Sequence, residues 1–360
     1  MMRAWACSFV SAIPLLLAVG CGDGGVATVG GSAGAGGAGG SSGEGGADAF
    51  EATLEHSFDV VVVEPATDDY WCQSWTLDND EPLYINKVRQ QNDGAWHHSN
   101  WYFLPEGSYG DDGTWRCQDR QFTQARAVVS GGAIFAQSTQ AFEETQAFGE
   151  GIAIVVPPRS MIIGDVHLFN PSAAPIETAL TMGFATLDEQ AVTVRLREVS
   201  FALNDIAIDP QRRSRWAQTC DLDGLVADSF NVYYVLGHYH EWGNYFKLSF
   251  VDDGGQETVI TELENAGEVL GVTVDPPINS SGAKRLRYEC GYNNTTDRTL
   301  TWGNAGEDEM CQFLAYIDGD TRIGAFPEGE TPVLVNETDD GVLMYEVSCG
   351  GSAFGLPAND

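Results

Sequence analysis

The chain has few basic residues: 18 Lys and Arg stand against 52 Asp and Glu, which gives a formal net charge of −34 over 360 residues. A protein that binds a phosphate backbone needs a basic surface, so this composition excludes nucleic acid as a partner. The acidic excess favours a soluble particle whose carboxylates mostly solvate its outside. The length predicts two domains with sizeable cores, although one large β domain would also fit.

Long apolar runs are also scarce. The run AIPLLLAVG, which follows Arg3, is too short to span a bilayer, so residues 1–21 are typical of an export signal. The run ends in LAVGC, which resembles a bacterial lipoprotein box and predicts lipidation of Cys21. Secretion with an unmodified Cys21 is the alternative. We therefore expect an exported protein, either secreted or held at a membrane (periplasmic or cell surface) only through a lipid anchor.

Residues 22–48 lack the apolar side chains that a core requires. They are mostly Gly, Ala and Ser, as in GGSAGAGGAGGSSGEGG, and this composition predicts a flexible linker. A linker of that length has a root-mean-square reach of roughly 25–30 Å. Such a reach is enough to hold a folded domain away from a membrane surface.

No CxxC motif is present, which weakens zinc-ribbon and thioredoxin-like interpretations. Apart from Cys7 and Cys21, an even number of cysteines remains, and in an exported chain this predicts three disulfides. Six cysteines allow fifteen pairings, so the residue positions alone leave the pairing open. The six are Cys72, Cys117, Cys220, Cys290, Cys311 and Cys349.

A helical repeat is missing too, because no long stretch carries apolar residues at a 3.6-residue period. Short β-branched or aromatic runs separated by turn signals predict antiparallel strands and an all-β fold of two β-sandwiches. The runs are FDVVVVEP, AVTVRLREVSFAL, VYYVLGHYH, YFKLSFV and TPVLVNE. A boundary near residue 200 divides the globular part almost equally, into residues 49–200 and 201–360.

Only six histidines occur in the chain, yet His238 and His240 stand together in LGHYHEW. If YVLGHYH is a strand, side chains at i and i+2 share one face, so the two imidazoles project together. Two imidazoles held in this way can chelate a metal ion. A pair of half-exposed strand histidines is the alternative interpretation.

A second histidine pair, His97 and His98, is adjacent in AWHHSNW. Neighbours on a regular strand point to opposite faces, so both can reach one ion only at a strand end or a bulge. His167, in GDVHLFNPS, ends an apolar run and could complete a site of three imidazoles. On its own it would be an ordinary strand histidine.

One methionine helps to choose among metals. Imidazole suits zinc, copper, iron and nickel alike, whereas a soft thioether favours Cu(I). Met310 lies in GEDEMCQF, beside Cys311 and away from any hydrophobic run. A methionine that fills a gap in the core is the alternative.

Taken in order, HH, VHLFNPS, HxH and DEMC resemble the copper type II, ascorbate-dependent monooxygenases, the family of peptidylglycine α-hydroxylating monooxygenase and dopamine β-monooxygenase. The resemblance covers roughly residues 50 to 355, and its specificity lies in the order and spacing of these short motifs. Five of the six histidines fall on motif positions. His56 does not, and we interpret it as structural.

The resemblance implies two jelly-roll-like β-sandwich domains in tandem, each with its own copper site. His97, His98 and His167 would hold an electron-transfer copper in the first domain. His238, His240 and Met310 would hold, in the second, the copper that binds O2 and substrate. The disulfides that the resemblance implies are Cys72–Cys117, Cys290–Cys311 and Cys220–Cys349.

The implied reaction hydroxylates a C–H bond of a small organic substrate, using O2 and two electrons from ascorbate or another one-electron reductant. The peptide hydroxylases bind a peptide carboxylate with an arginine, an asparagine and a tyrosine. The matching positions here are Leu236, Gln312 and Leu314. An apolar residue cannot replace that arginine, so we predict that glycine-extended peptides are not substrates and favour a more apolar substrate.

Two other functions remain open at this point. One is a non-catalytic copper-binding or copper-buffering lipoprotein that keeps the ligands without a substrate pocket. The other is a secreted zinc hydrolase on a β-sandwich, against which Met310 argues because zinc ligands are usually Cys, His or carboxylate.

Overall fold

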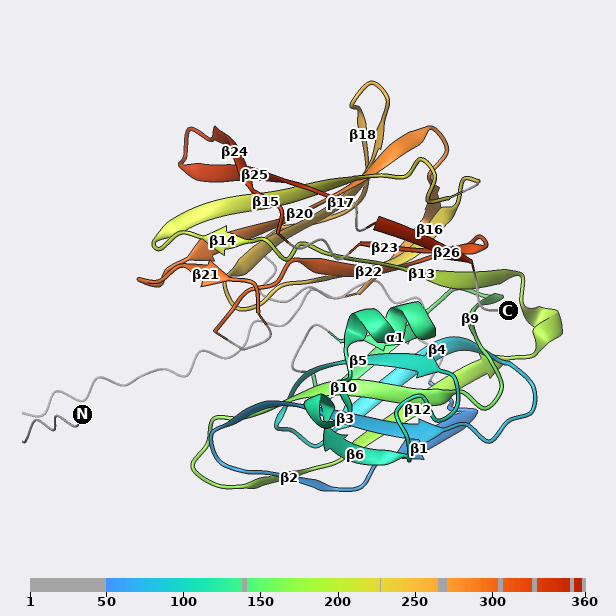
Figure 1. Cartoon of the computed structure of the whole chain (residues 1–360). Coiled ribbons are helices and arrows are strands. Elements are labelled where there is room, and N and C mark those ends of the chain that lie inside the picture. Colours follow the sequence, from blue (N-terminus) through green and yellow to red (C-terminus); the bar gives the residue numbers. More distant parts are fainter. Residues whose placement is uncertain are drawn as a thin grey trace, which may run out of the picture. The chain divides into compact units, whose positions relative to one another are not determined.

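The computed structural model describes residues 50–137, 141–226, 228–264, 271–303, 307–325, 329–349 and 353–357. The expected signal segment with Cys21 and the expected linker lie outside the described residues. Residues 49–360 belong to one compact unit. This unit is built almost entirely of β-strands, so the expected all-β sandwich fold is confirmed (Figure 1).

The first sandwich, which carries the blue and green strands of Figure 1, contains a five-stranded sheet that will hold part of the site. In spatial order its strands are β6 (Gly113–Arg116), β3 (Thr67–Thr76), β10 (Met161–Asn170), β5 (Trp96–Leu104) and β7 (Gly132–Ala136). The strands that complete this sandwich are β1 (Leu54–Ser57), β12 (Leu180–Leu187), β4 (Leu83–Asn92), β8 (Glu143–Ala147) and β9 (Ile152–Val156), with the small pair β2 (Val61–Val63) and β11 (Ile176–Thr178).

The second sandwich contains a six-stranded sheet and a second group of strands that carries the rest of the site. The six-stranded sheet is β18 (Glu257–Glu264), β17 (Gly243–Asp252), β20 (Ala283–Asn294), β15 (Arg212–Asp221), β25 (Val342–Ser348) and β24 (Val333–Glu337). The other strands are β13 (Val194–Ala202), β22 (Gln312–Ile317), β16 (Asn231–His238), β19 (Val272–Asn279), β23 (Thr321–Ala325) and β26 (Ala353–Pro357), with the small pair β14 (Ala207–Ile208) and β21 (Leu300–Thr301).

One sheet runs through both sandwiches. Strand β9 of the first pairs in parallel with β13 of the second, with Ile152 opposite Val194, so the two sets of strands form a continuous sheet. The expected boundary at residue 200 therefore falls inside β13. The hydrophobic core changes over on the same strand: Leu196 packs into the first core and Val199 into the second.

Strand β10 shows how the sequence places the site. It is central in its sheet, between β3 and β5, and nine of its ten residues, MIIGDVHLFN, are buried. At Gly164 a Cβ atom would lie 2.4 Å from the ring of Trp101, so only glycine lets that fully buried indole cross the strand. On the same strand Asp165 and His167, two residues apart, share one face.

The three disulfides that the resemblance implied are present. Cys72–Cys117 joins β3 to the short 3₁₀ helix η1 (Cys117–Arg120), and Cys220–Cys349 joins β15 to the residue that follows β25. Cys290–Cys311 joins β20 to the residue that precedes β22. Three disulfides are typical of a chain that folds in an oxidising compartment, in agreement with export.

The short helix α1 (Gln124–Ser130) was not predicted, because seven residues are too few to show a helical period. Thr123 caps it by accepting a hydrogen bond from the Arg126 amide at 3.3 Å. Another short element is the 3₁₀ helix η2 (Glu189–Ala191). Among the described residues, no helix has the length and apolarity that crossing a membrane requires.

Candidate metal centre

Two of the expected ligands come from one row of the five-stranded sheet. His167 on β10 lies opposite His98 on β5 and opposite Tyr70 on β3. Directly opposed residues share a face, so the two imidazoles and the phenol stand side by side. The Tyr70 ring stacks on His167 with 4.4 Å between centroids.

His97 reaches the same face because of a β-bulge. Trp96 pairs with Leu168 and His98 pairs with His167, which leaves His97 as the extra residue on β5. The sequence required a bulge or a strand end if both adjacent histidines were to reach one ion, and the bulge is present. We call His97, His98 and His167 the first-sandwich group.

The nitrogen atoms of the first-sandwich group converge. Nδ1 of His167 lies 3.1 Å from Nδ1 of His97 and 3.4 Å from Nε2 of His98. Metal–nitrogen bonds of about 2.0 Å in a tetrahedral site separate two ligand nitrogens by about 3.3 Å. The observed spacings therefore fit three nitrogens around one ion.

Asp68 orients the third imidazole of this group. Its Oδ1 lies 2.5 Å from Nε2 of His167, and a carboxylate accepts, so the imidazole carries its proton on Nε2. The lone pair of His167 is then on Nδ1, which faces His97 and His98. A carboxylate behind a ligating histidine is the usual arrangement in metal sites.

The second pair of histidines differs from the sequence-based expectation. Strand β16 ends at His238, which pairs with Gln312 on β22, and His240 lies beyond the strand. The prediction that strand alternation places both imidazoles on one face is therefore wrong. The two rings are nevertheless neighbours, with 5.2 Å between centroids, because other contacts hold His240 in place.

Those contacts come from the segment that contains Met310. Nδ1 of His240 lies 3.0 Å from the carbonyl oxygen of Asp308, to which it can donate a hydrogen bond. Nε2 of His240 is buried and has no hydrogen-bond partner in the described part of the chain, so its lone pair is open to a metal. Such an orphaned nitrogen is costly to bury unless something binds it.

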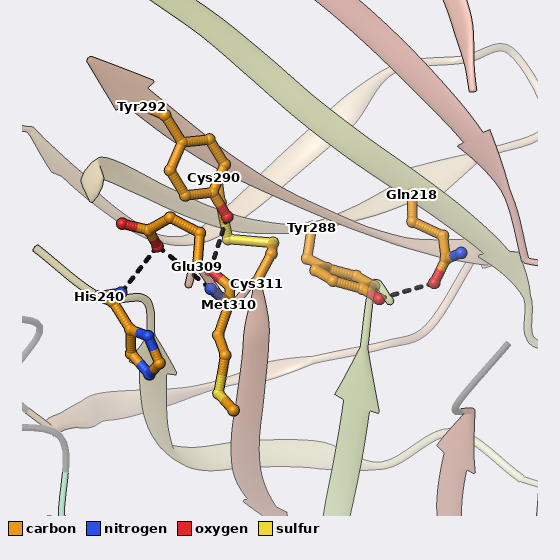
Figure 2. The surroundings of a disulfide bond; sticks show 8 residues. All are labelled: Gln218, His240, Tyr288, Cys290, Tyr292, Glu309, Met310 and Cys311. Carbon is orange, nitrogen blue, oxygen red and sulfur yellow. Dashed lines mark hydrogen bonds between the residues drawn. A yellow bond between two sulfur atoms is a disulfide. The ribbon is translucent and has the colours of Figure 1, made fainter. Parts of the chain in front are cut away.

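Met310 lies beside His240. The backbone N–H groups of both residues donate to the same oxygen, Oε2 of Glu309, at 3.1 and 2.9 Å. Figure 2 shows the thioether and the imidazole extending to the same side of that carboxylate. We call His238, His240 and Met310 the second-sandwich group.

The two groups are in contact, whereas the resemblance implied two separate sites. The rings of His98 and His238 are 5.0 Å apart between centroids, and those of His98 and His240 are 6.2 Å apart. His98 offers a ligand atom within 4.8 Å of those of His97 and His167, and does the same toward His238 and His240. The groups meet because His98 extends from β5 toward the end of β16.

Burial governs the protonation of these imidazoles. Desolvation lowers the pKa of His97 to about 4, with a further contribution from the neighbouring His167. Desolvation also lowers the pKa of His98 and His238 well below the ordinary value, and that of His167 and His240 in the same direction. Before any metal binds, the cluster is therefore neutral near pH 7, which is the ligating form of histidine.

A cavity opens beside His238. Its volume of about 40 Å³ has room for about three water molecules. Most of its lining is apolar and includes Leu236, Leu314 and Phe135. Leu236 and Leu314 are direct cross-strand partners on β16 and β22. Leu236, Gln312 and Leu314, which the sequence comparison matched to the carboxylate-binding positions of the peptide hydroxylases, thus all line the space next to His238.

A larger cavity of about 330 Å³ adjoins the first, since Gln124 and Gln312 line both. The larger cavity also has Asp165 in its wall, and Gln124 donates to Oδ2 of Asp165 at 2.7 Å. Burial raises the pKa of Asp165 to about 7, although hydrogen bonds from Gln124 and Asn100 oppose the shift. The two cavities together lead from this carboxyl group to His238.

His56 is structural, as interpreted from the sequence. Its ring stacks on Trp75 with 4.6 Å between centroids and an interplanar angle of 5°, and it meets Phe58 edge-on. It is not part of either metal-binding group found among the described residues.

Sequence reasoning missed Asp68, Glu309 and Gln124. Asp68 is one of two adjacent acids in TDDY, and Glu309 is one of three acids in GEDEMC, where the acidic excess of the chain hides them. The sequence did offer one signal at Glu309, because this acid directly precedes a methionine and a cysteine. Both of these residues are buried in the structure. An acid flanked in that way is itself a candidate for burial with specific partners.

The donor set fits copper. The first-sandwich group offers three imidazole nitrogens, and the second-sandwich group offers two imidazoles with a thioether beside one of them. A thioether is a soft ligand that favours Cu(I), while zinc sites usually take Cys, His or carboxylate.

No protein-family model matches the chain, and neither does any curated protein sequence. Among solved structures, the PBSX exported protein XepA aligns with 9% identity and a TM-score of 0.21 over 73% of this chain and 86% of that one. A putative secreted protein from Parabacteroides distasonis aligns with 10% identity and a TM-score of 0.19, over 74% and 88%. A structure of infectious bursal disease virus, Gt strain, aligns with 11% identity and a TM-score of 0.18, over 76% of this chain and 74% of that one. Likenesses this weak say nothing about function.

Proposed function

We propose that this protein is a copper-dependent monooxygenase that hydroxylates a C–H bond of a small organic substrate, with O2 and ascorbate or another one-electron reductant. The observation that carries the proposal is the meeting of five imidazoles from both sandwiches in one buried cluster, with Met310 beside His240 and a cavity beside His238. Two copper ions per chain, one for each group, match this ligand supply.

When bound, copper would supply one-electron transfer and activation of O2. The residues of the chain would hold the metal and set which nitrogen of each imidazole is protonated. Asp68 holds the His167 proton on Nε2, and the Asp308 carbonyl holds that of His240 on Nδ1, so each imidazole keeps a lone pair for the metal. The burial of His98, His167, His238 and His240 limits the access of bulk water to these four imidazoles.

The lining of the smaller cavity supports an apolar reacting group. Leu236 and Leu314 flank His238, and no cation occupies the position where the peptide hydroxylases have their arginine. A carboxylate brought there would lose much of its hydration without gaining a cation to pair with. We therefore propose that glycine-extended peptides are poor substrates and that a small apolar C–H group fits the space.

Anchoring at a membrane through Cys21 also belongs to this proposal. The three disulfides agree with an exported chain, and the sequence LAVGC supports lipidation. Labelling the expressed chain with a radioactive fatty acid, with Cys21→Ser as the control, tests the anchor separately from the chemistry.

The test of the function is incorporation of oxygen from ¹⁸O2 into an alcohol. Copper-loaded protein with ascorbate is offered a panel of small alkyl and benzylic compounds and one glycine-extended peptide. We expect labelled alcohol from the apolar compounds, its loss in Met310→Ile, and its retention in Met182→Ile, which changes a buried methionine on β12 away from the cluster.

Two copper ions per chain without labelled product from any compound would contradict the proposal. It would leave the non-catalytic copper-binding protein as the better account. Efficient turnover of the glycine-extended peptide would contradict the proposed substrate class alone.

A further inference from the structure

Glu309 is fully buried, and both oxygens of its carboxylate accept hydrogen bonds from backbone amides. Oε2 accepts from the N–H groups of His240 at 2.9 Å and Met310 at 3.1 Å, and Oε1 accepts from Trp242 at 2.8 Å. Burial raises its pKa to about 7 while these amides oppose the shift. One side chain therefore joins the loop after β16 to the segment before β22, as Figure 2 shows.

The loop that carries His240 needs such a contact. His240 lies outside the β-ladder, so strand pairing does not set its position. The loop turns back sharply, with the Gly243 amide donating to the His240 carbonyl oxygen at 3.1 Å. A Cβ at Gly243 would lie 2.0 Å from the Tyr239 ring, so the turn is also sterically tight. These contacts shape the loop but do not join it to Met310.

The Met310 segment is fixed on its other sides. The hydroxyl of Tyr292 donates to the Met310 carbonyl oxygen at 2.6 Å, and the next residue, Cys311, is bonded to Cys290. Both anchors come from β20, in the six-stranded sheet. Met310 is thus fixed by two contacts. The His240 imidazole meets this segment at the Asp308 carbonyl oxygen, and the Glu309 carboxylate connects the segment to the backbone of the His240 loop.

We propose that Glu309 is the positioning residue of the second-sandwich group: its carboxylate sets the imidazole of His240 and the thioether of Met310 side by side, so that one metal ion can bind both. The inference rests on the proposed function for the identity of the metal. Glu309 itself is not a ligand in this account, because both of its oxygens accept from backbone amides.

The variant that tests this role is Glu309→Gln, which keeps the shape of the side chain but replaces one accepting oxygen by a donating NH2 group. Glu309→Asp keeps the charge and retracts the carboxylate by one carbon, and serves if the Gln variant does not fold. The matched control is Glu307→Gln, two residues away, where the side chain is 77% exposed.

The first readout needs no metal. We expect amide hydrogen exchange at His240 and Met310 to be about tenfold faster in Glu309→Gln than in the wild type, because the charged oxygen that both amides share is replaced either by a neutral, weaker acceptor or by an NH2 group. Glu307→Gln should leave both amides unchanged. Unchanged protection of both amides in Glu309→Gln and in Glu309→Asp would overturn the proposal.

The second readout is X-ray absorption of the Cu(I)-loaded protein, with a Cu(I) titration against a competing chelator. We expect a sulfur neighbour in the wild type, its loss in Glu309→Gln, and about 10- to 100-fold weaker binding of one copper ion while the other is unaffected. A folded Glu309→Gln with the wild-type sulfur signal and affinity would overturn the positioning role.

The two readouts separate this inference from the function on which it rests. If the wild type shows no sulfur neighbour, the proposed copper site fails. Faster exchange at His240 and Met310 in Glu309→Gln would then still establish that the carboxylate positions both residues.

Discussion

The two ligand groups are built in different ways. In the first-sandwich group, neighbouring strands of one sheet put the imidazoles together: His167 lies opposite His98, and a bulge turns His97 to the same face. In the second-sandwich group, His240 lies past the end of its strand, and a buried carboxylate joins it to the Met310 segment. One group follows from strand register, and the other depends on tertiary contacts between distant segments.

This difference suggests a division of mechanical properties. A site on paired strands is as rigid as the sheet, which suits a metal that only exchanges electrons and must reorganise little. A site on a loop held by a few contacts can adjust around O2 and substrate, and it depends on those contacts for its geometry. His98 belongs to the first group and touches the second, so it links the two.

The largest effect is expected from removing that link. His98→Ala should weaken copper binding in the first-sandwich group by at least about 100-fold, because it removes one of three ligands, and in the second-sandwich group by about tenfold, because the His98 ring packs beside His238. His97→Ala should affect the first-sandwich group alone. Equilibrium titration with a competing Cu(I) chelator measures this, and loss of a single copper ion in both variants would show that the groups are independent.

A slightly smaller effect, on stability, is expected from breaking a contact between the two sandwiches that involves no metal ligand. Arg322 on β23 donates to the carbonyl oxygens of Val128 and Gly131 and pairs with Glu198 at 3.3 Å, with both side chains buried. Arg322→Met leaves the buried carbonyl oxygens of Val128 and Gly131 and the Glu198 side chain without their shared donor, and we expect about 3 kcal/mol less unfolding free energy. Urea unfolding measures it, and Arg195→Met, an exposed arginine, is the control.

If Arg322→Met unfolds with the same midpoint and slope as the control, the link does not hold the two ligand groups together. In that case the contact between His98 and His238 would have to be maintained by the continuous sheet through β9 and β13.

A moderate effect is expected from the residue that orients His167. Asp68→Ala removes the acceptor of the Nε2 proton, and we expect about tenfold weaker copper binding in the first-sandwich group only, since Asp68 is partly exposed and water can replace it. The same chelator titration measures it. Asp69→Ala, next to it on β3, is the control, and equal effects of the two variants would contradict the orienting role.

The smallest effect is a pH dependence carried by Glu198. Burial raises its pKa from 4.5 to about 7 despite the attraction of Arg322, so the folded chain holds this proton more tightly than the unfolded chain does. Its contribution to stability is complete below pH 4.5 and is lost as the pH rises through 7. Between pH 4.5 and pH 7, the unfolding free energy falls by at most about 1.4 kcal/mol per pH unit because of this group.

Unfolding free energies of the wild type and Glu198→Gln at several pH values between 4.5 and 7 isolate this contribution, because the titrations of other groups cancel in the difference. We expect the difference in stability to change across the window in favour of the variant as the pH rises. A difference that stays constant would mean that Glu198 remains ionised throughout.

Much of the fold could be predicted from local patterns. The runs at residues 191–203 and 245–251 fall on strands β13 (Val194–Ala202) and β17 (Gly243–Asp252), because alternating β-branched and aromatic residues fit a half-buried pleated surface. The need for either a bulge or a strand end at His97 and His98 followed from the two-residue period of a strand. The disulfide pairing did not follow from the six cysteine positions, which allow fifteen solutions, and was available only from the family resemblance.

Other features could not be predicted because they depend on contacts between distant segments. The parallel pairing of β9 with β13 leaves no mark in either strand, so the sheet that unites the sandwiches was not foreseen. The placement of His240 depends on Glu309, whose burial becomes evident only when β16 and β22 are paired. In a chain with 52 acidic residues, the one local signal for Glu309 is its position directly before Met310 and Cys311.

Anomalous diffraction at the copper edge from crystals of the Cu(I)-loaded protein examines the two groups directly. Our account predicts two copper peaks per chain, one among His97, His98 and His167 and the other bonded to His238, His240 and the sulfur of Met310. A single shared peak, or a second peak without Met310 as a neighbour, would contradict it.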